Sequence, residues 1–218
     1  CKWLLNRYCN YSCSYCWPHA HSNKKDFLDE NTYLLAIDHI INQFKKNGFN
    51  TISWGWAGGE VTFNPHFLSI LEEIQSYDVT MSSNLVTNLS QSLKWWEVFV
   101  KNTSKFVRGR VNASWHKEYL REEKKRLLFK EKLVFLKNSN INTVVNCVML
   151  PGELEEMKKL IDFFNDCEIP VMVKACRSNN KVIEGYTNKE LEFVQKQIKH
   201  KNPKVMLTID DDENEYYY

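Results

Sequence analysis

The sequence predicts an α/β fold in which parallel strands alternate with helices that lie outside the sheet. Short apolar runs alternate six times with segments whose apolar residues recur at helical spacing. This succession demands a parallel sheet, because each strand–helix–strand crossover returns the chain in the same direction. The apolar runs are continuous, which is typical of strands with both faces buried. An open doubly wound sheet and a barrel of six strand–helix units both fit, and both carry their chemistry at the carboxyl ends of the strands.

Each strand is predicted from an apolar run bounded by turn or polar residues. The first strand, 2–6, contains Trp3, Leu4 and Leu5 and precedes a connection of about 25 residues. Connections of this length inside compact domains usually carry function. The later strands are expected at 51–56, 79–83, 106–114, 143–150 and 171–176, and a further one at 204–209.

Each helix is predicted from an apolar stripe and a boundary residue. The first helix is expected at 31–46, with Ile37 and Ile41 in its stripe and Gly48 as its stop. Asn64 is expected to cap the second helix, with Pro65 in its first turn. The other expectations are a third helix around Trp96, a fourth at 118–138 with Leu120, Leu127 and Val134 on one face, a fifth after Pro151-Gly152, and a last helix opened by the capping box Thr187-x-x-Glu190.

Length and composition indicate one globular domain without an obvious charged partner. The chain has 218 residues, 43% of them hydrophobic and 26% charged, and a net charge of +2. That balance gives no reason to expect nucleic acid or an anionic membrane as partner. There is no apolar run of spanning length and no charged-then-apolar leader. The sequence does not begin with Met and ends in three tyrosines, so we expect a fragment of a longer protein.

Seven cysteines, three clustered and four scattered, favour a reducing compartment. We therefore expect a cytoplasmic protein. Cys147 and Cys176 lie in apolar strands and are expected to be small buried hydrophobic residues. The clustered thiols are better explained as metal ligands.

Cys9, Cys13 and Cys16 form a C-x3-C-x2-C cluster in the long connection after the first strand. A closed structural zinc site needs four protein ligands, and His19 or His21 is near enough in sequence to supply the fourth. The alternative is an iron–sulfur cluster held on three irons, whose fourth iron stays open to a ligand.

The cysteine spacing, with Tyr15 directly before the third cysteine, resembles the motif of the radical S-adenosylmethionine (radical SAM) superfamily. The resemblance implies a (β/α)6 partial TIM barrel in which Cys9, Cys13 and Cys16 hold a [4Fe-4S] cluster. It implies that the amino and carboxylate groups of S-adenosylmethionine chelate the fourth iron, with Tyr15 near the adenine. One electron then cleaves the sulfonium, and the 5′-deoxyadenosyl radical abstracts a hydrogen from substrate. The predicted core is 1–185, with the cluster loop at 6–30; residues 186–218 form a C-terminal helix and short extension.

Gly58-Gly59-Glu60, after the second strand, resembles the family's Gly-Gly-Glu motif, which contacts the amino group of S-adenosylmethionine. The glycines permit close backbone approach, and the carboxylate can accept from an ammonium group. A glycine-rich turn with a solvated Glu is the alternative. Asn84 is expected to end the third strand, where relatives carry Thr-Asn-Gly and this chain has Leu85 in place of Gly; its alternative role is in the turn.

Three further strands supply candidates. Ser114 ends the fourth strand, where the resemblance implies a bond to the ribose or the methionine carboxylate. Asn146 interrupts the apolar fifth strand, and a buried polar group needs a partner; the resemblance places this strand near the adenine. His116 either faces the substrate or makes a local bond at a helix start. Arg177 follows the sixth strand and could meet an anionic group.

The sequence therefore predicts a radical SAM enzyme whose substrate is a peptide or, alternatively, a sugar or other small metabolite. An electron donor such as flavodoxin or ferredoxin is the expected partner, with no membrane and no nucleic acid. The competing hypothesis is a non-catalytic zinc- or iron–sulfur-binding module on a degenerate barrel. A third is an interaction protein that exposes Trp95 or Trp96.

Overall fold

The computed structural model describes residues 1–16, 22–178, 181–201, 208–209 and 215–216. Its main sheet has six strands in chain order, and every neighbouring pair is parallel. The strands are β1 (Lys2–Asn6), β2 (Thr51–Gly58), β3 (Thr80–Thr87), β4 (Arg108–Trp115), β5 (Asn142–Met149) and β6 (Val171–Ala175). The predicted α/β class and the partial-barrel order of six strand–helix units are confirmed.

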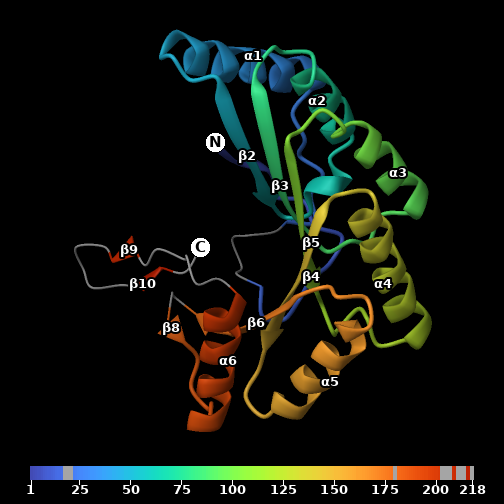
Figure 1. Ribbon diagram of the computed structural model, residues 1–218, viewed down its shortest axis with the longest axis vertical. Coiled ribbons are helices and arrows are strands. Elements are labelled where there is room, and N and C mark those ends of the chain that lie inside the picture. Colours follow the sequence, from blue (N-terminus) through green and yellow to red (C-terminus); the bar gives the residue numbers. More distant parts are fainter. Residues whose placement is uncertain (17–21, 179–180, 202–207, 210–214, 217–218) are drawn as a thin grey trace.

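The helices follow the strands along the outside of the sheet. They are α1 (Glu30–Lys46), α2 (Phe67–Ile74), α3 (Leu93–Lys101), α4 (Glu123–Asn138), α5 (Leu154–Asn165) and α6 (Asn188–Lys201), with a 3-10 turn η1 (Val61–Phe63) before α2. In Figure 1, α1 to α5 trace an arc round one face of the sheet, and α6 lies beside β6. The described residues also form two short antiparallel pairs, β7 (Arg177–Ser178) with β8 (Lys181–Val182) and β9 (Thr208–Ile209) with β10 (Glu215–Tyr216).

The expectation that the strands are buried on both faces is wrong. In β4, Val111 and Ala113 are fully buried, whereas the alternating Arg110, Asn112 and Ser114 are only half-buried. The arc of helices covers one face alone, so the sheet has an apolar convex face and a polar concave face. The same alternation in β2 and β3 makes the concave face accessible over several strands.

Three predicted element boundaries are also wrong. β3 continues to Thr87 instead of stopping at Ser83, and α4 begins at Glu123 instead of residue 118. Asn64 does not cap α2, because its side chain accepts from His66 N in the turn that precedes the helix. The helix begins at Phe67, so Pro65 lies outside its first turn.

The predicted apolar face of α4 is wrong as well. Leu127 is 52% exposed, while Phe129, Leu133 and Leu136 are buried in the main core. Apolar residues occur around much of this helix, so sequence spacing offered more than one stripe. Packing against the sheet selects among them.

The remaining core residues agree with expectation. Cys147 and Cys176 are 2% and 8% exposed, as predicted for small buried hydrophobic residues. Trp96 is fully buried, and Trp95 stacks on Phe67 and Phe99, so the tryptophan pair belongs to the core and offers no exposed docking site.

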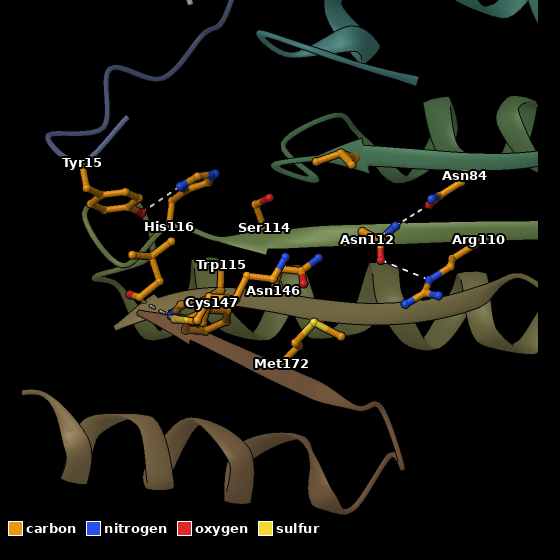
Figure 2. Close-up of a pocket in the computed structure, with 13 residues that line it drawn as sticks. Tyr15, Asn84, Arg110, Asn112, Ser114, Trp115, His116, Asn146, Cys147 and Met172 are labelled. Carbon is orange, nitrogen blue, oxygen red and sulfur yellow. Dashed lines mark hydrogen bonds between the residues drawn. The ribbon is translucent and has the colours of Figure 1, made fainter. Parts of the chain in front are cut away.

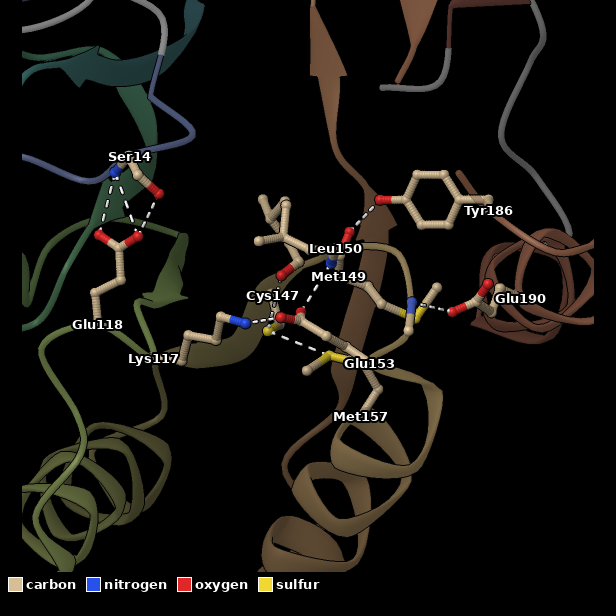
Figure 3. Close-up of polar contacts among 12 residues, drawn as sticks. Ser14, Lys117, Glu118, Cys147, Met149, Leu150, Glu153, Met157, Tyr186 and Glu190 are labelled. Carbon is tan, nitrogen blue, oxygen red and sulfur yellow. Dashed lines mark hydrogen bonds and ion pairs between the residues drawn. The ribbon is translucent and has the colours of Figure 1, made fainter. Parts of the chain in front are cut away.

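Helix α6 is attached to the end of β5 by polar contacts (Figure 3). The Tyr186 hydroxyl donates to Met149 O, and Gly152 N donates to Glu190 Oε1 over 2.6 Å. Thr187 and Glu190 exchange bonds between side chain and backbone, which confirms the predicted capping box. In the described part of the chain, no helix combines the length and apolar character needed to cross a membrane.

Candidate active site

The three cysteines lie in a loop that is closed at its base beside β1. Cys9 N donates to Ser22 O over 3.1 Å, and Ser22 N donates to Arg7 O over 2.6 Å. His19 and His21, the alternative zinc ligands, lie outside the described residues. Among the residues described, no three His, Cys, Asp or Glu side chains are grouped for a single metal ion.

Gly58 and Gly59 allow the end of β2 to touch the start of this loop. A Cβ on Gly58 would lie 2.1 Å from Asn6 O, and one on Gly59 would lie 2.2 Å from Tyr8 O. The close approach lets Gly59 N donate to Asn6 O over 2.8 Å and Glu60 N donate to Tyr8 O over 2.6 Å. The glycines are therefore required for contact with the cysteine-loop backbone.

The Glu60 carboxylate binds protein donors and is only 1% exposed. It accepts from Thr62 N and Oγ1, from Thr87 Oγ1 over 2.7 Å, and from Asn88 N over 2.5 Å. Burial raises the pKa of Glu60 above its usual range. This carboxylate braces the end of β2 against the end of β3, and the solvated-Glu alternative is wrong.

The prediction that Asn84 ends the third strand is wrong because β3 runs three residues further, to Thr87. Thr87-Asn88-Leu89 therefore stands at the strand end, and Leu89 has a φ of 58°, a backbone conformation that favours glycine. Asn88 Nδ2 donates to Asn10 Oδ1 over 2.8 Å, which ties this strand end to the cysteine loop. The polar Thr-Asn pair was the sequence signal that we missed.

The segment between β4 and α4 holds the opposite side of the cysteine loop. Tyr119 stacks on Tyr11 at 3.8 Å between ring centroids, and its hydroxyl accepts from Ser12 N over 2.5 Å. Glu118 accepts from Ser14 N and Oγ (Figure 3). Sequence reasoning missed both residues, since a helix was expected to begin here.

His116 packs directly on the cysteine loop. Its Nδ1 lies 2.8 Å from Tyr15 Oη and 3.2 Å from Cys13 Sγ, and burial lowers the pKa of His116 to about 4. Its partners come from the cysteine loop, more than 100 residues earlier, so the contact is not the local helix-start bond that we considered.

Burial raises the pKa of Cys9 to about 11 and that of Cys13 to about 12, and the charge of Cys16 adds to both increases. The three sulfurs therefore lie within electrostatic reach of one another.

A cavity of about 370 Å³ opens on the concave face beside this loop. Figure 2 shows Tyr15, Ser114 and His116 toward one end and Asn84, Asn112 and Arg110 toward the other. Asn146 also lines the cavity, and it is half-buried, so the expected need for a buried protein partner does not arise. Gly58, Gly59 and Glu60 are absent from its lining. Of the polar residues that line the cavity, sequence reasoning missed Arg110, Asn112 and Lys174.

The donor set fits a [4Fe-4S] cluster. Three soft thiolate ligands on one short loop can each bind a different iron of a cubane, which leaves the fourth iron to a small ligand. The cavity begins at Tyr15, inside that loop, so a ligand of the fourth iron would extend into it. The arrangement suits a radical cofactor placed next to a substrate cavity.

Comparison with known proteins identifies the class. The model of the Radical SAM superfamily matches residues 3–164, which is most of the chain. The protein belongs to this superfamily, whose enzymes use a [4Fe-4S] cluster and S-adenosylmethionine, so the predicted family and cofactors are confirmed. A search of curated proteins found no match.

Solved structures share the fold at low sequence identity. Streptococcus suis SuiB bound to precursor peptide SuiA is 17% identical, with a TM-score of 0.63 over 93% of this chain and 45% of that one. SuiB bound to S-adenosylmethionine is 16% identical, with a TM-score of 0.59 over 91% of this chain and 43% of that one. Native anSMEcpe with bound AdoMet and Cp18Cys peptide is 17% identical, with a TM-score of 0.64 over 91% of this chain and 56% of that one. The chain thus spans about half the length of these structures.

Proposed function

We propose that this chain is the catalytic core of a radical SAM enzyme that abstracts a hydrogen atom from a peptide. The observation that carries the proposal is the position of the cavity, which begins at Tyr15 in the cysteine loop and continues along the concave face. This position would put a substrate beside the cofactor and inside a walled space.

In this proposal Cys9, Cys13 and Cys16 bind the cluster, which when bound supplies the electron that cleaves the sulfonium of S-adenosylmethionine. Ser114 and Asn146 offer hydrogen-bonding groups to the bound nucleoside, and Tyr15 covers it at the loop. The backbone at Gly58-Gly59 and the buried Glu60 hold the loop at the strand ends. These residues position the reactants and limit the access of water.

The preference for a peptide has two supports. The concave face is accessible along several strands, which suits an extended partner. Two of the solved structures with this fold are described with peptides, SuiA and Cp18Cys. A flavodoxin or ferredoxin is the proposed electron donor, and the division at residue 185 between core and extension is likewise part of the proposal.

The test is formation of 5′-deoxyadenosine. The protein is purified without oxygen, reconstituted with iron and sulfide, reduced and mixed with S-adenosylmethionine. Wild type should form 5′-deoxyadenosine, Cys13→Ala should not, and Cys167→Ala, which changes a cysteine outside the loop, should behave as wild type. Formation by Cys13→Ala would contradict the proposal. Stoichiometric zinc without iron would favour the non-catalytic module.

A further inference from the structure

The cavity wall carries two cations and, among the described residues that line it, no carboxylate. Arg110 on β4 and Lys174 on β6 both line the cavity, and the described residues that line it include no Asp or Glu. Neither side chain forms an ion pair with another residue in the described part of the chain. A concave wall that carries charges of one sign focuses the electrostatic field and raises the local concentration of counter-ions, which here are anions.

The polar residues around Arg110 orient its guanidinium. Asn112 Nδ2 donates to Asn84 Oδ1, which leaves Asn112 Oδ1 to accept from Arg110 Nε over 3.1 Å. The hydrogen bond to Nε leaves the two terminal nitrogens of Arg110 for another acceptor. The fork geometry of those nitrogens matches the two oxygens of a carboxylate or phosphate.

Lys174 lies close enough to interact with Arg110. Much of the Lys174 side chain is exposed, yet partial desolvation at the cavity wall lowers its pKa, and the charges of Arg110 and Arg177 lower it further. Like charges on one cavity wall repel each other, and a bound oxyanion would offset that repulsion.

Arg110 lies far from the cysteine loop along β4. Figure 2 shows Arg110, Asn84 and Asn112 at the end of the cavity away from Tyr15 and His116. Arg110 precedes Ser114 by four residues, about 13 Å at the usual strand rise, and His116 by six, about 20 Å. The carboxylate of S-adenosylmethionine, held at the cluster, would stay near the loop, so an anion at Arg110 would belong to the substrate.

We propose that Arg110 and Lys174 form a subsite for an oxyanion group of the substrate, a carboxylate or phosphate displaced by several bonds from the hydrogen that is abstracted. This inference rests on the proposed function and narrows the substrate to acidic molecules. The same oxyanion chemistry is available from an acidic peptide side chain and from a small phosphorylated metabolite, and the choice of probe separates them.

The test measures binding to reconstituted protein in saturating S-adenosylmethionine by calorimetry. The probes are an acetylated Gly-Glu-Gly-Glu-Gly amide, the same peptide with Gln for Glu, and inorganic phosphate. Wild type should bind an acidic probe and not the Gln peptide, with affinity that falls as salt rises. Arg110→Gln and Lys174→Gln should each weaken binding about tenfold, as expected for one partly solvated charged contact. Lys159→Gln, which removes the same charge from the exposed side of α5, should change affinity less than twofold.

The results of the binding experiment test the inference independently of the proposed function. Tighter binding of the Glu peptide assigns the subsite to a peptide, and tighter binding of phosphate assigns it to a phosphorylated metabolite. Equal binding of the Glu and Gln peptides without binding of phosphate, or no binding of either acidic probe, overturns the inference, and this wild-type result does not depend on whether the variants fold. Unchanged affinity in both folded variants overturns it too. If wild type forms no 5′-deoxyadenosine, the proposed function fails while the binding data still stand.

Discussion

Replacement of Gly59 by Ala should displace the cysteine loop. The new Cβ would lie 2.2 Å from Tyr8 O and 2.4 Å from Arg7 O, where contacts under 3.0 Å essentially never occur. Both clashing atoms belong to the backbone, so the loop must move by about 1 Å to reach an ordinary contact distance. That movement breaks the bonds from Gly59 N to Asn6 O and from Glu60 N to Tyr8 O.

The magnitude follows from these contacts. Two backbone hydrogen bonds contribute about 1 kcal/mol each, and overpacking costs about 1 to 3 kcal/mol more. Gly59→Ala should therefore lower the free energy of unfolding by about 3 to 5 kcal/mol. The matched control is Gly55→Ala within β2, four residues earlier, where the nearest atoms to a Cβ are at 3.7 Å. It should change stability by less than about 1 kcal/mol.

The assay is urea unfolding of the reduced, metal-free protein, followed by iron content after reconstitution. We expect Gly59→Ala to lose both stability and bound iron, and Gly55→Ala to keep both. If Gly59→Ala retains the wild-type midpoint, the close packing of β2 on the cysteine loop is not present in solution. If it is destabilised but binds iron normally, the loop does not depend on this contact for its ligand geometry.

Three other predictions test the core, the loop contacts and the buried histidine. Leu133→Ala should cost about 3 kcal/mol in urea unfolding because Leu133 is fully buried, whereas Leu127→Ala on the same helix should cost less than about 0.5 kcal/mol; the reverse order would contradict the observed face of α4. Tyr119→Phe keeps the ring on Tyr11 but removes the acceptor for Ser12 N, so a loss of about 1 kcal/mol is expected, and no loss would show that the ring alone holds the loop. Burial lowers the pKa of His116 from 6.5 to about 4, so the unfolded chain binds a proton in that window that the folded, metal-free chain does not. Stability should therefore fall by up to about 3 kcal/mol as the pH drops from 6.5 to 4, and His116→Gln should flatten this part of the profile; equal slopes would argue against the buried position.

The order of the elements could be predicted because it depends on local pattern. Helical stripes such as Ile37 and Ile41 and the capping box Thr187–Glu190 act within a few residues, and they appear where expected. The cysteines follow β1 in the sequence, and parallel strands present their carboxyl ends at one edge of the sheet. Their position at that edge could therefore be predicted. The apolar face of α4 did not follow from local pattern, because several faces of that helix were apolar and tertiary packing selected Leu133 over Leu127.

The polar face of the sheet was a signal that sequence reasoning passed over. The alternation of Arg110, Asn112 and Ser114 with Val111 and Ala113 has period two, which indicates a strand with one accessible face. The apolar residues taken alone predict burial on both sides. A strand with such alternation inside a parallel sheet indicates a partial barrel whose concave face is accessible. A doubly wound sheet, in contrast, is covered by helices on both faces, so the alternation distinguishes the two architectures.

The contacts that hold the cysteine loop could not be predicted, because they join segments that are distant in sequence. Asn10 meets Asn88, Ser14 meets Glu118, and Tyr15 meets His116, each pair separated by more than 70 residues. A motif search identifies the three thiols, yet their positions depend on these strand-end residues, which carry no spacing of their own. Asn88 and Glu118 therefore tie the positions of the three cysteines to the ends of β3 and β4. Substitutions there should alter cluster retention before they alter the fold, since each removes a contact of the loop and leaves the apolar core intact.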